Sequence, residues 1–331
     1  MAGSQLPGME GFAREFVDPE HYIIDITWRI WEGRGIELIR QWYSPDCIVR
    51  SPHRVTNTVE AVVEGTYATL SEFPDRQLLP EEIIIGLKNP GFYSSHRVRS
   101  TATYSGDGAF GPAIKREIGM LTIADCLCRD NRIVEEWLVR DQASMAIQLG
   151  LDPVALGLSK GERSPGTYAI GTAAYLERWS DPAGLTIVGD RTIANRAIDA
   201  MASVWSDRKT DRLAGYRDRS LRFEGPSGML VYGHERFGRA VGGILDSLPD
   251  GLFAAHHVIV REDEDRPVRI AMRWSFTGTH TGRGAYGEAK GCPLSILAIS
   301  HFELRHGMIL NEWMLADDLA VWAQIGAHEQ K

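Results

Sequence analysis

The sequence predicts an α+β protein built from two tandem copies of one domain, each with helices followed by an antiparallel meander of strands. Three observations lead to this prediction. The motif TYSGDGAFG at 103–111 returns as THTGRGAYG at 279–287. Around it, 97–150 and 273–326 align without a gap and share 17 of 54 residues. Each copy also places helical periodicity before strand periodicity, as in α+β domains.

The helices come first in each copy. Apolar residues recur at helical spacing over 20–42 and over 193–217, which predicts the first helix of each copy. Shorter helices are expected near 59–72 and 234–247, and each ends at a Pro-Asp turn.

Four strands are expected next in each copy, because apolar and polar residues alternate there. The predicted strands are 81–87, 95–105, 117–128 and 132–140 in the first copy and 255–261, 268–281, 294–304 and 308–315 in the second. The sequences DNRI and RHGMI are typical of hairpin turns.

These elements predict four segments in the chain. Residues 1–18 form an N-terminal arm, 19–150 the first domain, 151–191 a linker and 192–331 the second domain. The linker is rich in Gly, Pro and Ser, and its residues 172–179 have the pattern of a short helix.

The composition narrows the class of protein. The chain has 331 residues, of which 44% are hydrophobic and 24% charged, and a net charge of −8. No basic run indicates a nucleic-acid surface. No signal peptide or membrane span is recognisable. The four cysteines have neither metal-ligand spacing nor the density of a disulfide framework. We therefore expect a cytoplasmic protein with no nucleic-acid or membrane partner.

A family resemblance rests on the repeated block. The second copy runs GTHTG, Gly-Ala-Tyr-Gly, a hydrophobic strand, a Gly turn, Glu-Trp, Asp and Gln-Ile-Gly. This order resembles the SnoaL-like polyketide cyclases of the nuclear-transport-factor-two-like superfamily. The resemblance covers roughly 195–326 and, with the looser ATYSG, roughly 20–150.

The resemblance implies a cone, in which a curved sheet is wrapped by helices around an apolar pocket. Relatives pair through the convex sheet face, so the two copies are expected to form an intramolecular pseudo-dimer, and further homodimerisation is open. Family members include aldol cyclases, ketosteroid isomerases, dehydratases, epoxide hydrolases, C–C lyases and non-catalytic binding domains. Where they catalyse, they do so mostly without a cofactor. Fold alone does not choose among these functions.

The alternation of side chains along the strands predicts which residues line the pocket. In 268–280 the apolar face carries Met272 and Trp274, and His280 shares its parity. The same face of the first copy carries His96 and Tyr104. A histidine titrates near neutral pH, so we expect His280 to be catalytic and the other four to contact substrate.

The last strand adds Trp313 and Asp317, which share a face, as do Trp137 and Asp141. Burial beside Trp would raise the pKa of an Asp and make it a competent base near neutral pH. The family also uses an acidic residue late in the chain as base. The alternative for Asp317 is the N-cap of the helix that follows it.

Three more histidines are catalytic candidates. His301 aligns with Asp125 on the neighbouring strand, and the sequence leaves open which face it occupies. His256 and His257 are adjacent on a strand, so at most one enters the pocket, and such a pair chelates a metal poorly. His53 follows the first strand, in a region that reaches the cone mouth in relatives.

The functional hypotheses follow from these residues. Trp28 and Trp205 lie on the first helices, where they are either core or walls for an aromatic substrate. The second copy holds more histidines and is the favoured catalytic copy. The first hypothesis is cofactor-free acid–base chemistry, an aldol-type cyclase or a retro-aldol, aldehyde-releasing lyase on a hydrophobic, aromatic or polyketide-like molecule. An isomerase, a dehydratase, an epoxide hydrolase and a non-catalytic binding pair are the alternatives, and no metal site is expected.

Overall fold

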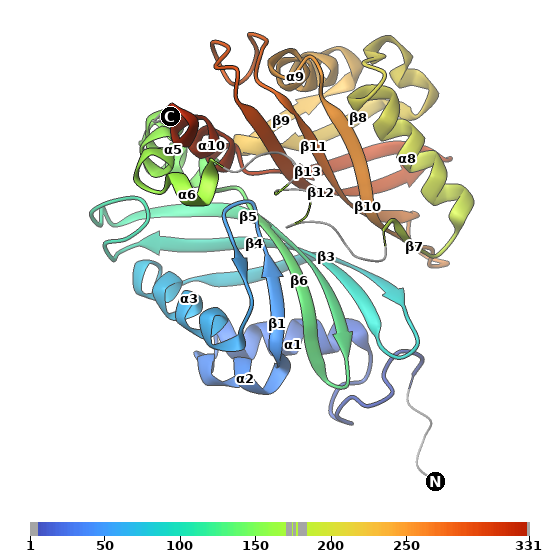
Figure 1. Cartoon of the computed structure of the whole chain (residues 1–331). Coiled ribbons are helices and arrows are strands. Elements are labelled where there is room, and N and C mark those ends of the chain that lie inside the picture. The colour runs from blue at the N-terminus through green and yellow to red at the C-terminus, as the bar shows by residue number, and fades with distance from the viewer. Residues whose placement is uncertain (1–5, 170–173, 175–176, 178–183, 330–331) are drawn as a thin grey trace. The chain divides into compact units, whose positions relative to one another are not determined.

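The computed structural model describes residues 6–169, 174, 177 and 184–329. It consists of two compact units, the first comprising Met1–Arg140 with Gln148–Gly150 and the second Asp141–Ile147 with Leu151–Lys331. Each unit contains one sheet and helices that pack against it (Figure 1). The predicted fold class, two tandem α+β bodies, is thereby confirmed.

The first unit contains a sheet of six strands. They are β1 (Tyr43–Arg50), β2 (Val55–Thr56), β3 (Gln77–Leu87), β4 (Phe92–Tyr104), β5 (Arg116–Arg129) and β6 (Arg132–Arg140). Their order is β2-β1-β6-β5-β4-β3. All pairs are antiparallel except β1 with β6, which is parallel.

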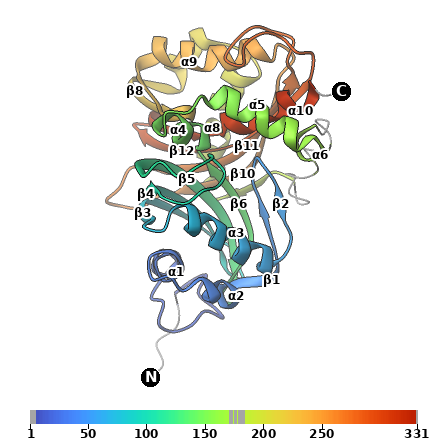
Figure 2. The same ribbon diagram turned by 90° about the vertical axis from the view of Figure 1, so that its left-hand side faces the viewer.

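The helices of the first unit cover one face of this sheet (Figure 2). They are α1 (Pro19–Trp31), the short helices η1 (Ile36–Leu38) and α2 (Ile39–Trp42), and α3 (Val59–Glu72). The Asp18 side chain caps α1, and Pro19 occupies its first turn. Tyr22, Ile26 and Ile30 recur at helical spacing and are buried in the core. We call the sheet face that packs on these helices the core face.

The second unit contains a sheet of seven strands. They are β7 (Thr186–Val188), β8 (Arg217–Gly225), β9 (Met229–Tyr232), β10 (Leu252–Arg261), β11 (Arg269–Thr279), β12 (Pro293–Arg305) and β13 (Met308–Leu315). Their order is β7-β10-β11-β12-β13-β8-β9. β8 pairs with β13 in parallel, as β1 does with β6.

The helices of the second unit divide into two groups. Those of the repeated domain are α8 (Arg191–Trp205), η2 (Thr210–Gly215), η3 (Pro226–Gly228), α9 (Gly233–Ser247) and α10 (Asp318–His328), and the others are α4 (Gln142–Gln148), α5 (Pro153–Arg163) and α6 (Pro165–Tyr168). α5 and α10 lie side by side (Figures 1 and 2). A Cβ on Gly161 would lie 2.0 Å from the Ala323 carbonyl oxygen, and one on Gly326 would lie 2.2 Å from that of Leu158. These glycines therefore allow the two backbones to approach closely.

The structure differs from the sequence-based expectation in several places. The first helix of each copy ends earlier than expected, α1 at Trp31 and α8 at Trp205, and short helices follow it. β1 and β8 add a parallel strand to each expected meander. The N-terminal arm is part of the first core, since Met9, Phe12 and Phe16 are buried there. The expected linker contains α5 and α6, whereas the helix expected over 172–179 falls largely outside the described residues.

Candidate functional site

The two units repeat the same local structure around the Pro-Asp turns. Asp75 accepts hydrogen bonds from the backbone nitrogen and the hydroxyl of Thr103, at 2.7 and 2.6 Å. Asp250 accepts the same two bonds from Thr279, both at 2.7 Å. This pair of contacts validates the internal alignment residue by residue, so the two core faces can be compared position by position.

The core of the second unit is filled by aromatic rings. The rings of Trp205 and Trp274 lie 4.8 Å apart between centroids, and Phe276 and Phe253 pack against them. Met272 is fully buried in the same cluster. The prediction that Met272 and Trp274 face the interior is confirmed.

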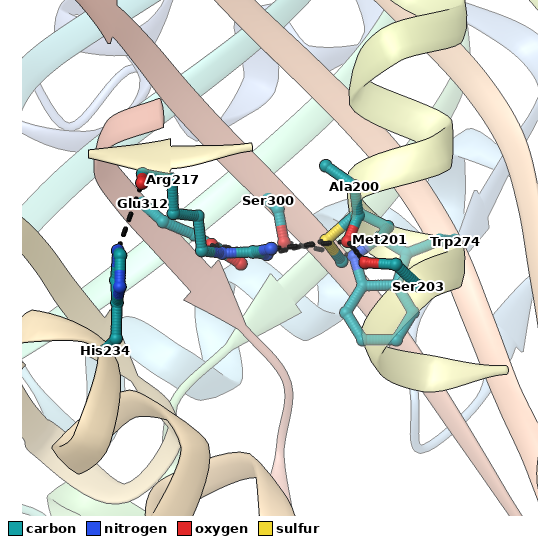
Figure 3. A network of polar contacts seen from close by, with 8 residues as sticks. All are labelled: Ala200, Met201, Ser203, Arg217, His234, Trp274, Ser300 and Glu312. Carbon is teal, nitrogen blue, oxygen red and sulfur yellow. Dashed lines mark hydrogen bonds and ion pairs between the residues drawn. The ribbon is translucent and has the colours of Figure 1, made fainter. Parts of the chain in front are cut away.

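Several polar groups of this second core pair with one another (Figure 3), whereas Nε1 of Trp205 and Oε1 of Glu312 make no hydrogen bond within the described structure. Both guanidinium atoms Nε and Nη2 of Arg217 donate to Glu312, at 3.1 and 2.9 Å. The indole nitrogen of Trp274 donates to Ser300 at 3.0 Å. The interior is therefore closed by packing and by a buried ion pair.

Polar residues replace apolar ones at the equivalent positions of the first unit. His96 stands where the second unit has Met272, Ser100 where it has Phe276, Thr122 where it has Ala298, Arg140 where it has Ala316, and Arg76 where it has Gly251. Strand pairing places His96, Ser100, Thr122 and Arg140 on the core face, because Thr122 pairs with Val98 and with Arg140. The polar interior thus belongs to the first copy.

Arg76 is the most deeply buried charge of this interior. It lies in the turn after α3 and is 2% exposed. Its Nη2 donates to the Ser100 hydroxyl at 3.1 Å, and its guanidinium carbon lies 4.7 Å from the ring centroid of Trp31. Burial lowers its pKa well below the ordinary value, and the charge of Arg140 lowers it further. An arginine nevertheless stays protonated in proteins, so this site holds a buried positive charge.

Glu136 provides the carboxyl group beside Arg140. The Tyr43 hydroxyl donates to Glu136 Oε2 at 3.1 Å. Burial raises the pKa of Glu136, whereas the Arg140 charge and the Tyr43 hydrogen bond oppose that rise. Tyr43 keeps its proton, because burial and the neighbouring Glu136 raise its pKa well above the ordinary value. We call Tyr43, Arg76, Glu136 and Arg140 the polar cluster.

His96 completes the core face of the first unit. It is 6% exposed, and burial lowers its pKa to about 4, so the ring is neutral at neutral pH. It lies on β4 and Glu136 on β6, with β5 between them. Glu136 lies across the sheet from Ser94, two residues along β4 from His96. Two strand spacings and two residue rises therefore separate their backbones by about 12 Å, a distance that a small ring system and the two side chains can bridge.

Several buried polar atoms of this core make no hydrogen bond within the described structure. They are Nε and Nη1 of Arg76, Nε of Arg140, Nε2 of His96, Nε1 of Trp42, Oγ1 of Thr122 and Oγ of Ser94. Buried polar groups nearly always have partners, and exceptions point to water, an ion or a ligand. These unpartnered buried atoms therefore indicate that the core of the first unit is the candidate ligand-binding site.

The structure places His280 and Tyr104 each against the repeated loop of its own unit. The Tyr104 hydroxyl donates to the Gly111 carbonyl, and Gly111 pairs with Gly108 in a small β-bridge. Gly284 and Gly287 form the same bridge in the second unit. His280 is fully buried there, and burial lowers its pKa while the nearby Gly287 backbone opposes the shift. The two side chains thus occupy matching positions against the loop.

Asp317 and Asp141 both cap helices. Asp317 accepts from the backbone nitrogen of Leu319 at 3.1 Å at the start of α10. Asp141 accepts from Ser144 at 2.9 Å at the start of α4, and from Gly228 at 2.9 Å. Burial raises the pKa of Asp141 to about 7, the charge of Asp317 adds to this rise, and the backbone hydrogen bonds oppose it.

The expectation that Trp313 lines the interior is wrong. Trp313 pairs with His301 and with Glu224, on the sheet face opposite to Phe302 and Glu312. In the pairing of β12 with β13, Leu304 lies opposite Ile309 and Glu303 lies opposite Asn311, so β13 holds one extra residue, Leu310, at this point. Such a bulge inserts one residue and reverses the alternation beyond it, so Ile309 and Glu312, rather than Ile309 and Trp313, share the core face.

Other candidates also lie away from the core faces. His301 pairs with Ala271 and His257 with Arg273, so both histidines occupy the opposite face of the second sheet, where they are buried. Trp28 is 55% exposed and does not line the interior, contrary to its expected substrate role. His53 is half-buried in the turn after β1.

The members of the polar cluster were not found from the sequence. Strand alternation placed Trp137 rather than its neighbour Glu136 on the pocket face, because the bulge is invisible in the alternation. Arg76 and Arg140 looked like ordinary charges in a turn and at a strand end. The sequence signal that could have revealed them is the difference between the aligned copies, in which Arg76, Arg140 and His96 of the first copy correspond to Gly251, Ala316 and Met272 of the second.

Among the described residues, no group of three or more His, Cys, Asp or Glu side chains is arranged to hold a metal ion. None of the helices in the described part of the chain has the length and apolar character needed to cross a membrane.

Comparison with known proteins supports the resemblance seen in the sequence. Residues 195–325 match the family model described as SnoaL-like polyketide cyclase. The match falls on the second copy and spans less than half of the chain. No curated protein matches the sequence.

Several solved structures are similar to about 40% of this chain, which is the length of a single copy of the repeat. IdmH from Streptomyces antibioticus is 22% identical and covers 40% of this chain and 99% of its own, with a TM-score of 0.36. TsrD from Streptomyces laurentii is 19% identical and covers 42% and 98%, with a TM-score of 0.37. A SnoaL-like polyketide cyclase from Agrobacterium tumefaciens is 17% identical and covers 41% and 99%, with a TM-score of 0.32.

Proposed function

We propose that this protein is a small-molecule enzyme of the polyketide-cyclase type, as the family matched by residues 195–325 suggests, and that its catalytic groups lie in the first unit. The observation that carries the proposal is the buried carboxyl of Glu136, bonded to Tyr43 and set among unpartnered polar atoms. The interior of the second unit is packed with aromatic rings. Acid–base chemistry therefore has suitable groups in the first core.

Glu136 is the proposed general base. A carboxyl whose pKa is raised by burial can accept a proton near neutral pH. The Tyr43 hydroxyl holds one oxygen at 3.1 Å and fixes the orientation of the group. Arg140, on the same strand and face, keeps part of the population ionised by opposing the rise in pKa.

His96 is the proposed donor to the substrate oxygen. Its low pKa keeps the ring neutral, and a neutral imidazole carries one N–H that can donate to a carbonyl or an enolate. Its Nε2 atom is buried and makes no hydrogen bond with any described residue. The substrate would lie between His96 and Glu136.

The proposed reaction makes or breaks a C–C bond next to a carbonyl. In the cleavage direction, Glu136 takes the proton of a β-hydroxyl, the C–C bond breaks, an aldehyde leaves and the enolate oxygen accepts a hydrogen bond from His96. The protonated Glu136 then returns the proton to the enolate carbon. In the cyclase direction the same steps run in reverse. An isomerase, dehydratase or epoxide hydrolase would use the same base and donor.

The substrate is proposed to be hydrophobic and aromatic. The rings of Trp31 and Trp42 belong to or pack on the first core, and the Trp42 indole nitrogen adds an unpartnered donor. Flat aromatic walls with a few polar atoms suit a polyketide-like ligand. The filled second unit is proposed to be a non-catalytic copy.

The test is turnover of a panel of aryl β-hydroxy ketones, with and without a carboxyl group, followed by aldehyde release and by proton exchange at the α-carbon in deuterated water. We expect Glu136→Gln to reduce both signals by about 100-fold or more. Asp317→Asn, at the α10 cap, is the matched control and should retain turnover. Full activity of Glu136→Gln would refute the assignment, and loss in Asp317→Asn alone would move the base to the second unit.

A further inference from the structure

We infer that Arg76 and Arg140 bind a carboxylate group of the substrate in the core of the first unit. This inference rests on the proposed function, because it names the class of molecule that the acid–base site accepts. It adds a specificity that the SnoaL-like match does not contain.

Arg76 presents two buried donors without partners. A guanidinium carries five N–H bonds. Nη2 donates to Ser100, and Nε and Nη1 make no hydrogen bond to any described residue. One face of the group is covered by the Trp31 ring, so ligands approach its edge, the geometry in which a guanidinium binds a carboxylate through two parallel hydrogen bonds.

Arg140 faces the same interior from the sheet. It pairs across strands with Thr122, whose buried Oγ1 also has no partner within the described structure. Its Nε is buried and unpartnered. Arg140 is near enough for its charge to lower the pKa of Arg76. Two like charges held together in a buried site require an anion to offset their repulsion and desolvation.

The charge balance favours a monoanion. The Glu136 carboxylate raises the pKa of Arg140, whereas among the described residues no acidic side chain raises that of Arg76. With Glu136 ionised, the three groups carry one net positive charge. Glu136 would also repel a dianion, which disfavours a phosphate monoester. Arg54, exposed between β1 and β2, adds positive charge beside Arg140 and would attract an anion.

The second unit shows that these charges are not needed for the fold. It has Gly251 and Ala316 at the positions of Arg76 and Arg140. Phe276 replaces Ser100, and its ring fills the space beside Gly251. The same architecture therefore forms with an apolar pair in place of Arg and Ser, and the guanidinium groups of the first copy call for another role.

The experiment measures binding of naphthoate, naphthamide and naphthyl phosphate to the full-length protein by titration calorimetry. The first variant is Arg140→Gln. The second is the double variant Arg76→Gly with Ser100→Phe, which copies a pair that the second unit already accommodates. Arg239→Gln is the control, because that side chain is 70% exposed on α9. Thermal unfolding verifies that each variant is folded.

We expect naphthoate to bind the unchanged protein with one molecule per chain. Both variants should weaken that binding by about tenfold or more, as loss of a charged hydrogen bond does, and Arg239→Gln should not. Naphthamide should bind at least about tenfold more weakly than naphthoate. Equal binding of acid and amide, undiminished binding in folded variants, or naphthyl phosphate binding as tightly as naphthoate would overturn the inference.

Glu136→Gln separates this inference from the proposed function. It removes a negative charge near the proposed carboxylate, so naphthoate should bind it at least as tightly as the unchanged protein, although turnover is lost. If turnover survives in Glu136→Gln, the proposed base is wrong while the binding data still decide the role of Arg76 and Arg140. If turnover is lost in Glu136→Gln but the affinity for naphthoate is the same in both arginine variants as in the unchanged protein, only the carboxylate inference fails.

Discussion

The ring of Phe276 occupies the space next to Gly251 so completely that a Cβ atom added to Gly251 would lie 2.1 Å from its Cζ. At the equivalent positions of the first unit, Arg76 donates a hydrogen bond to Ser100. The first unit therefore combines a large residue, Arg76, with a small one, Ser100, whereas the second unit combines the small Gly251 with the large Phe276. The same space holds a guanidinium group in the first core and an aromatic ring in the second.

This packing makes a prediction about stability. Gly251→Ala should lower the free energy of unfolding by about 1–3 kcal/mol, because the new methyl overpacks the Phe276 ring. Gly242→Ala on α9 is the matched control, because its Cβ would meet no atom within 4 Å. That substitution should stabilise by about 0.4–1 kcal/mol. Urea unfolding of both variants provides the measurement. An unchanged free energy of unfolding in Gly251→Ala would show that the Phe276 ring can move aside, and would contradict the prediction.

The buried ion pair of the second core makes another prediction. The side chains of Arg217 and Glu312 are 0% and 1% exposed. Glu312→Gln leaves the guanidinium without a counter-charge and should destabilise by about 3–5 kcal/mol. Glu288→Gln removes one partner of the exposed Arg283 pair and should change stability by less than about 1 kcal/mol. Similar losses in the two variants, measured by chemical denaturation, would contradict this view.

His96 should contribute to the pH dependence of stability. Its pKa is about 4 in the folded protein against an ordinary value of 6.5. Between these values the unfolded chain binds the proton more readily, so stability should fall as pH drops from about 6.5 to 4, by at most on the order of 3 kcal/mol. His96→Met, which copies Met272, should remove this part of the slope. Denaturation midpoints measured across that range test the prediction, and an unaltered slope would refute it.

Tyr43 should tune the pH profile of turnover. Its hydroxyl donates to Glu136 and opposes the rise in the pKa of that carboxyl. Tyr43→Phe removes the bond, so the pKa of Glu136 should rise further. The acidic limb of kcat/KM against pH should then move to higher pH in the variant. A limb that stays in place would show that Glu136 does not set it.

Much of the fold could be predicted from the sequence, because long segments alternate regularly. β6 and β13 begin and end at the predicted residues, and Met272 and Trp274 face the core as alternation requires. A strand before His53 was expected, but the bounds and the pairing of β1 escaped prediction because its sequence, YSPDCIVR, mixes polar residues and a proline. It is held by pairing with a strand far along the chain, which no local pattern reveals.

The candidate site could be predicted less well, for two physical reasons. A single bulge in β13, where it pairs with β12, reverses the facing of Trp313 and Glu312, and alternation cannot detect one inserted residue. The importance of Arg76 arises from burial against Trp31 and proximity to Arg140, which depend on tertiary structure. His96, in contrast, was correctly predicted to lie on the core face of its strand.

The close crossing of α5 and α10 has a consequence for the history and handling of this chain. α5 lies in the segment between the two copies, yet its glycine face is fitted to a helix at the far end of the second copy. The folded second unit is therefore longer than the duplicated domain, because it also includes α5 from the segment between the copies. A second copy excised at residue 192 would expose the glycine face of α10, so an autonomous fragment should begin upstream of Pro153.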